Sequence, residues 1–171
     1  MKNENIDVYK FGGSSLADSD CLRDVCDLIH QNTSDNIIIV VSAMSGVTNQ
    51  LLAITQEKND RNWDGVIDHF KKTLKEINID SEKKTELMAN FSNNMETIDN
   101  LIALNQFDPD KTEENPVLGF GEVWSSNIIF NLLVTLSSKD PKKREVHFLN
   151  PLDIINLSYG EMVPMVNWEK S

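Results

Sequence analysis

The sequence predicts an α/β fold in which a mainly parallel sheet lies between helices. Two strand-like segments, 6–11 and 37–41, each precede a loop rich in glycine and serine and then a helical pattern. This alternation is typical of parallel sheets. The second segment, IIIVV, contains no polar residue, so we expect it to be buried on both faces. The 171 residues are 40% hydrophobic and 25% charged, which is a globular composition.

The first 55 residues predict strand, loop and helix twice in succession. Residues 6–11 (IDVYKF) are rich in β-forming side chains and end at a glycine pair. The next segment predicts a helix with Asp18 or Ser19 as its N-cap. Its apolar positions recur at i, i+3, i+4 and i+7: Leu22, Val25, Cys26 and Ile29. After the second strand, Thr48 is the predicted N-cap of another helix.

Long helices follow. Apolar stripes in 63–79 and 82–104 predict two helices whose methionine and aromatic side chains fill a core. A third helix is predicted at 117–137. Ser, Thr and Asn residues interrupt its apolar run, which favours burial within a protein over a membrane span. VHFL at 146–149 predicts a third strand, and 150–171 has no clear pattern.

The charge distribution argues against nucleic acid as a partner. The chain has 27 acidic and 16 basic residues and a net charge of −11, whereas nucleic-acid-binding surfaces gather Lys and Arg. The basic cluster at 142–144 is interpreted as a solvated loop. Cys21 and Cys26 lack metal or redox spacing, and the amino terminus lacks the apolar segment of a signal peptide. We therefore expect a cytoplasmic protein with free thiols.

Three histidines are too far apart in sequence to suggest a metal site: His30, His69 and His147. Neither a Ser-His-Asp nor a Cys-His arrangement stands out. We expect these histidines to lie at the surface or to fill space.

Two loops follow the predicted strands and belong at one edge of the sheet. KFGGSS at 10–15 offers a lysine and backbone N–H groups to an anion, although the spacing is neither that of a Walker loop nor GxGxxG. The alternative is a glycine turn that simply ends a strand. SAMSGVT at 42–48 offers hydroxyl groups, and its alternative is simple capping of the next helix.

Glu122 is the only charged residue between 117 and 138. A buried carboxylate is costly unless it is paired, so Glu122 is a candidate for binding a cationic group such as an α-ammonium. The alternative is a solvent-facing Glu at a helix N-terminus, where the helix dipole stabilises it. The residues alone do not decide between the two.

Three segments in this order resemble the aspartokinases of the amino-acid kinase family. KFGGSS, VVSAMSGVTNQL and GEVWSS match the patterns KFGG[ST]S, VVSAxxGxTNxL and GExxS. The likeness is greatest to the kinase part of bifunctional aspartokinase–homoserine dehydrogenases of the methionine-branch type. It implies an amino-acid-kinase-like three-layer fold, of which residues 1–171 would be the amino-terminal lobe of the catalytic domain.

The resemblance implies transfer of the γ-phosphoryl group of ATP, with Mg²⁺, to the β-carboxylate of L-aspartate. This is the first step of lysine, threonine and methionine synthesis. On the phosphate side, Lys10 would stabilise the transferring group. Gly12 and Gly13 would donate backbone N–H groups to the phosphates, with Ser14 and Ser15 beside them.

On the substrate side, the resemblance implies that Ser42 and Thr48 hold aspartate and that Glu122 binds its α-ammonium. Phe120 stands where many family members have His. The chain also lacks the family's GRxGSD motif and its later adenine and Mg²⁺ segment. We therefore expect no useful kinase activity from these residues alone. One alternative is a non-catalytic aspartate-binding or interaction module, which would form homo-oligomers through an exposed sheet edge. The other is another amino-acid kinase, such as a glutamate kinase.

Overall fold

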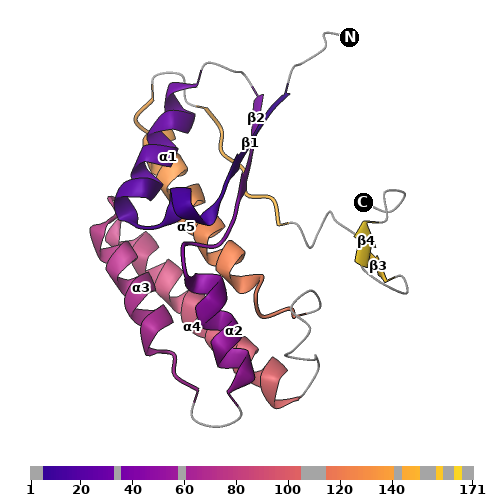
Figure 1. The fold of residues 1–171 in the computed structure, drawn as a ribbon. Coiled ribbons are helices and arrows are strands. Elements are labelled where there is room, and N and C mark those ends of the chain that lie inside the picture. Colours follow the sequence, from indigo (N-terminus) through magenta and orange to yellow (C-terminus); the bar gives the residue numbers. More distant parts are fainter. Residues whose placement is uncertain are drawn as a thin grey trace.

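The computed structural model describes residues 6–32, 36–57, 61–104, 115–140 and 144–150, together with two short strands further along the chain. The elements follow one another as β1 (Ile6–Phe11), the 3-10 helix η1 (Gly13–Leu16), α1 (Ser19–Gln31), β2 (Asn36–Val41), α2 (Val47–Gln56), α3 (Asp64–Glu76), α4 (Ser81–Ala103), α5 (Phe120–Ser137), β3 (Leu157–Tyr159) and β4 (Pro164–Val166). The predicted α/β class is confirmed (Figure 1).

The pair formed by β1 and β2 is parallel, as predicted. Its register runs from Ile6 opposite Asn36 to Phe11 opposite Val41, and α1 connects the two strands. Both strands therefore end at the same edge of the sheet. β3 and β4 form a separate antiparallel pair.

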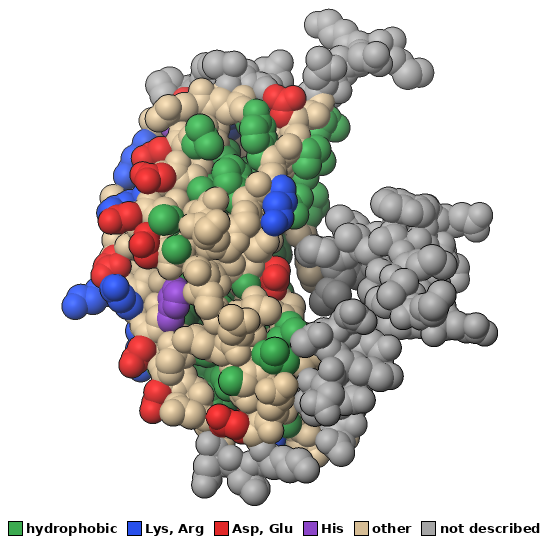
Figure 2. All heavy atoms as spheres, viewed as in Figure 1, with side chains coloured by type: hydrophobic (Ala, Val, Ile, Leu, Met, Phe, Trp, Pro, Cys, Tyr) green, Lys and Arg blue, Asp and Glu red, His purple; other side chains and the backbone are tan. Residues whose placement is uncertain are grey.

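One face of the β1–β2 pair is open within the described part of the chain. The outward aliphatic side chains are 42–64% exposed: Ile6, Val8, Ile38 and Val40. The opposite face contributes Phe11, Ile39 and Val41 to the core, and Figure 1 shows the helices gathered on that side. The prediction that β2 is buried on both faces is therefore wrong for these residues, because only one helical layer covers them. Figure 2 shows hydrophobic side chains along the margin of the molecule where β1 and β2 lie.

Helix α5 lies at the centre of the helical layer, in contact with α1, α2, α4 and β2. Its Trp124 joins an aromatic cluster in which the ring centroid of Phe91 lies 4.2 Å from Phe70 and 4.7 Å from Trp124. The indole N–H of Trp124 donates to Asn94 Oδ1 at 3.1 Å. The predicted core role of the stripes in α3 and α4 is confirmed by this packing.

Of the two predicted N-caps, the one for α1 is confirmed and the one for α2 is wrong. Asp18 caps α1, since its carboxylate accepts a hydrogen bond from the backbone N–H of Cys21 at 2.9 Å. Thr48 is not the N-cap of α2. The helix starts at Val47 after Gly46, whose φ of +82° places it in the left-handed region that favours glycine.

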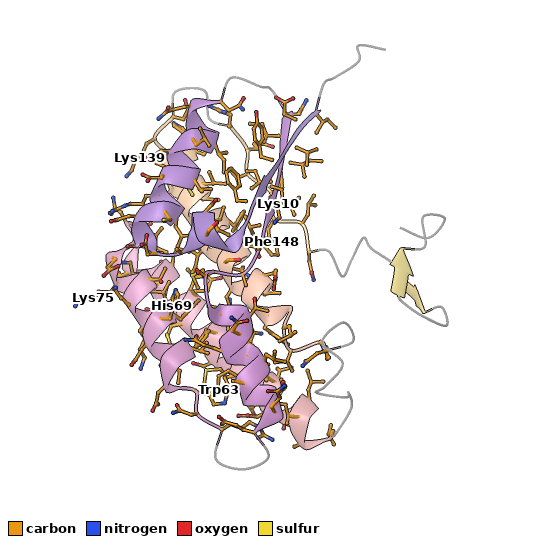
Figure 3. The ribbon with its side chains drawn as sticks, in the orientation of Figure 1. Lys10, Trp63, His69, Lys75, Lys139 and Phe148 are labelled. Atoms are coloured by element: carbon orange, nitrogen blue, oxygen red, sulfur yellow. The ribbon has the colours of Figure 1, made fainter. Side chains whose placement is uncertain are left out.

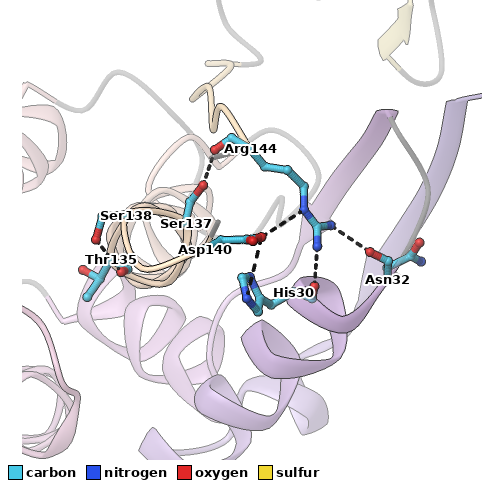
Figure 4. Close-up of polar contacts among 7 residues, drawn as sticks. All are labelled: His30, Asn32, Thr135, Ser137, Ser138, Asp140 and Arg144. Atoms are coloured by element: carbon cyan, nitrogen blue, oxygen red, sulfur yellow. Dashed lines mark hydrogen bonds and ion pairs between the residues drawn. The ribbon is translucent and has the colours of Figure 1, made fainter. Parts of the chain in front are cut away.

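Two predictions about the region after α5 are wrong. Residues 144–150 contain no strand, so VHFL at 146–149 is not one. Arg144 is half-buried rather than fully solvated. Its guanidinium donates to the carbonyl oxygens of Asn32 (2.8 Å) and His30 (2.5 Å), and its Nε lies 3.6 Å from a carboxylate oxygen of Asp140 (Figure 4). Arg144 thus ties the end of α1 to the chain after α5. Lys142 and Lys143 lie outside the described residues.

The cysteines and histidines show no sign of a metal or redox site among the described residues. Both cysteines are free, and burial raises the pKa of the Cys26 thiol to about 12, which makes it unreactive. Burial also lowers the pKa of His69. Among the described residues, no group of three or more His, Cys, Asp and Glu is placed to hold a metal ion. Nor does any described helix combine the length and apolar character needed to cross a bilayer.

Candidate functional site

The two predicted loops meet at the carboxyl edge of β1 and β2. The backbone N–H of Ser42, the first residue after β2, donates to the carbonyl oxygen of Phe11 at 3.0 Å. This bond continues the strand pairing by one step, so both loops leave the sheet side by side. The expected juxtaposition is therefore present.

The glycine loop packs directly on the second loop. A Cβ atom added to Gly13 would lie 3.0 Å from the carbonyl oxygen of Ala43, so a larger residue would force the loops apart. Gly12 has an extended backbone, and its carbonyl accepts the N–H of Ser15 at 3.0 Å to begin η1. The Ser14 and Ser15 side chains are exposed.

Lys10 lies at the carboxyl end of β1 with its side chain exposed (Figure 3). Its Nζ would lie 3.6 Å from a Cβ atom on Gly12, so the amine reaches over the glycine loop. Within the described residues the Lys10 amine has no hydrogen-bonding or ion-pair partner. A positive charge therefore lies beside the backbone of the glycine loop, where an anion would be favoured.

The second loop ends at the first turn of α2. Ser42 is half-buried, whereas Ser45 and Thr48 are exposed. Val47, between them, is buried in the core and fixes the start of the helix. The hydroxyl group of Thr48 is therefore presented from a helical turn that is anchored by the buried side chain of Val47.

Glu122 lies in the first turn of α5 and is half-buried. Its carboxylate has no hydrogen-bonding or ion-pair partner among the residues that the structure describes. The N-terminus of a helix favours a negative charge at this position. The structure thus leaves a carboxylate available to a cation close to the second loop.

Contacts between α5 and the second loop hold Glu122 near Ser42. The hydroxyl of Ser125 donates to the carbonyl oxygen of Ser42 at 2.7 Å. A Cβ atom on Gly121 would lie only 2.7 Å from the Cβ of Ala43, so the helix touches the loop with its glycine. The second loop is therefore in direct contact with both of the other motifs at one sheet edge.

Sequence reasoning missed the residues that make these contacts. Ala43 lies between Gly13 and Gly121, and Ser125 bonds to Ser42 from 83 positions away in the sequence. The GExxS pattern contained Ser125, but it did not show that the Ser125 hydroxyl donates to a residue outside its own helix. Such a bond depends on packing between distant elements.

Two shallow hollows lie elsewhere and do not form the site. The first, of about 440 Å³, lies between α1 and α3 and is lined by Asp18, Ser19, Asp20, Arg23, Lys72 and Glu76. The Ser19 hydroxyl there donates to Glu76 Oε2 at 2.7 Å. The second, of about 400 Å³, lies at the end of α5. The chemistry of the three motifs therefore sits on an open edge rather than in either hollow.

Known proteins are similar to this chain in sequence. The chain is 24% identical over 160 residues to bifunctional aspartokinase/homoserine dehydrogenase 2 of Arabidopsis thaliana, a match that covers 88% of this chain and 17% of that protein. It is 28% identical over 131 residues to bifunctional aspartokinase/homoserine dehydrogenase 2 of Escherichia coli K12, which covers 74% of this chain and 16% of that protein. The chain thus spans about a sixth of the length of these relatives.

The fold is shared as well. The crystal structure of Escherichia coli aspartokinase III in complex with aspartate and ADP superposes with a TM-score of 0.63 at 24% identity. That match covers 75% of this chain and 29% of the other. A family model described as the amino acid kinase family matches residues 5–136, which include all three motifs. The chain therefore belongs to the amino acid kinase family.

Proposed function

We propose that this chain carries the aspartate-binding and phosphate-facing part of an aspartate kinase. The observation that carries the proposal is the contact of three motifs at one sheet edge, which places Lys10 and Glu122 on elements joined through Ser42. Two relatives are named aspartokinases, and a structural neighbour was solved with aspartate and ADP. Both points support the same substrate for this chain.

The chemistry needs charge neutralisation more than a base. The nucleophile, a β-carboxylate, is already an anion, and the phosphoryl group that it attacks is also negative. The exposed amine of Lys10 and the backbone N–H groups of Gly12 and Gly13 supply positive potential at the edge where these groups would meet. Ser42 and Thr48 would hold the substrate, and Glu122 would pair with its α-ammonium.

The nucleotide fits these residues only through its phosphates. Lys10 and the glycine loop suit a phosphate chain, and ATP would supply the group that is transferred. The described residues offer no acidic cluster for Mg²⁺, and we assign no step to it here. We propose turnover, and its place in lysine, threonine and methionine synthesis, for an enzyme that also carries a GRxGSD motif, which these 171 residues do not contain.

Replacing Glu122 with alanine should weaken aspartate binding by about tenfold or more. A hydrogen bond to a charged group contributes about 1.5–3 kcal/mol, and Glu122 is the partner proposed for the α-ammonium. The measurement is titration of L-aspartate into the isotope-labelled chain, followed by amide chemical shifts.

Glu82→Ala is the matched control, since Glu82 is also an acidic residue in a first helical turn but belongs to α4. It should leave the dissociation constant unchanged. Equal binding by Glu122→Ala and the unaltered chain would remove Glu122 from the site. Binding of L-glutamate without binding of L-aspartate would favour the alternative of a glutamate kinase.

The open sheet face favours self-association as a second property, compatible with an interaction module. Four exposed aliphatic side chains lie on it, and each strand of the described pair has a free edge. We expect concentration-dependent association in sedimentation experiments, weakened about tenfold by Val8→Lys through loss of apolar burial. Leu28→Lys is the control, since Leu28 is 59% exposed on α1. A monomer at all concentrations would exclude this property.

A further inference from the structure

Ser125 holds the backbone of Ser42 from the helical side. Its hydroxyl donates to the Ser42 carbonyl at 2.7 Å, while the Ser42 N–H donates to Phe11 at 3.0 Å. Ser42 is thus bonded to α5 on one side and to the end of β1 on the other. The bonds connect the elements that carry Glu122 and Lys10.

This use of a serine hydroxyl differs from that of its neighbour. Serine within a helix commonly bonds to a carbonyl three or four residues earlier, and Ser126 does so, donating to Val123 at 2.9 Å. For Ser125 the Glu122 carbonyl lies at 3.1 Å, but the contact with Ser42 is shorter. A hydroxyl has one proton to donate, so the shorter contact is the main bond.

The position of Ser125 excludes direct contact with a ligand. The residue is 0% exposed, and its one polar group is occupied by Ser42 and its own helix. Glu122, three residues earlier and on the same side of the helix, is half-buried and has a free carboxylate among the described residues. Whatever fixes the first turn of α5 against Ser42 therefore also fixes the backbone from which this carboxylate extends.

We propose that Ser125 is a positioning residue for recognition of the aspartate α-ammonium. It holds the first turn of α5 so that the Glu122 carboxylate stays in register with Ser42 and Thr48. The inference rests on the proposed function, because it takes Glu122 as the partner of the ammonium. It adds a residue that touches no substrate but sets the preference for an amino acid over the same dicarboxylate without its amino group.

The test compares L-aspartate with succinate, which has both carboxylates but lacks the ammonium. Both ligands are titrated into the 171-residue chain and into Ser125→Ala, and the ratio of the two dissociation constants is measured. We expect Ser125→Ala to reduce the preference for aspartate about five- to tenfold with little change for succinate. Ser126→Ala is the matched control and should keep the preference.

The outcomes separate the inference from the proposed function. If the unaltered chain prefers aspartate and Ser125→Ala keeps that preference, the role of Ser125 is overturned and the proposed function stands. Equal loss of affinity for both ligands means a general structural role and also overturns the inference. Absence of any preference in the unaltered chain overturns the proposed function, and this inference with it.

Ser125→Cys covers the case in which Ser125→Ala does not fold. The thiol is close in size and remains a weaker donor, so its preference for aspartate should lie between those of the unaltered chain and Glu122→Ala. A folded Ser125→Cys chain with the full preference would contradict the proposal.

Discussion

Replacing Phe91 with alanine is expected to lower the free energy of unfolding by about 3–5 kcal/mol. Phe91 is 0% exposed and lies between Phe70, on which it stacks at 4.2 Å, and Trp124 at 4.7 Å. The substitution would leave a cavity among three helices and remove two aromatic contacts. Urea unfolding followed by circular dichroism measures the loss.

Leu104→Ala is the control for this prediction. Leu104 lies at the end of the same helix and is 65% exposed, so its truncation should change stability by less than about 0.5 kcal/mol. Equal effects of the two substitutions would mean that the aromatic cluster is not the main core. The prediction also bears on the site, because Trp124 lies two residues after Glu122 and anchors the start of α5.

The order of elements up to α5 follows from local sequence signals. Apolar periodicity predicts the helices, the aliphatic runs predict the strands, and Asp18 marks a helix start. The meeting of the glycine loop with the second loop could also be predicted, since parallel strands end at one edge. That part of the site needs only the topology and the position of each motif after its strand.

Other features depend on which partners a segment finds. The apolar run IIIVV indicates a strand that could be covered on both faces. It does not say whether the residues that cover the second face are among those described. Ile38 and Val40, which lie on that face, are exposed in the described structure. VHFL at 146–149 has the composition of a strand without pairing with one. Its Phe148 packs its ring edge-on against Phe130 instead, at 5.8 Å between centroids. Periodicity alone cannot decide such cases.

Close contacts between distant residues are the least predictable part of the site. At Gly121 the structure leaves no room for a larger residue. Ala43 Cβ lies where a Cβ atom would be added, and Val47 and Leu51 lie close by. The GExxS pattern includes Gly121 and not Gly119, but it does not say that Gly121 packs against another element. Only the packing of α5 on α2 and its preceding loop shows this.

Gly121→Ala is therefore expected to destabilise the chain by about 1–3 kcal/mol. The added Cβ would lie 2.7 Å from Ala43 Cβ and 3.3 Å from a methyl group of Val47, so α5 must move away from the loop. Because Gly121 is the second residue of α5, little of the gain of about 1 kcal/mol that alanine brings to a helix interior offsets this cost. The shift also lengthens the Ser125–Ser42 bond, so the preference for aspartate over succinate should fall.

Gly119→Ala tests whether the effect comes from packing. A Cβ atom at Gly119 would meet only the Pro116 carbonyl at an ordinary 3.7 Å, and the backbone there has a helical φ of −64°. Urea unfolding should show no loss for this variant, and ligand preference should be unchanged. If both glycines tolerated alanine equally, the close approach of α5 to Ala43 would be wrong. The arrangement that places Glu122 beside Ser42 would then lack its tightest contact.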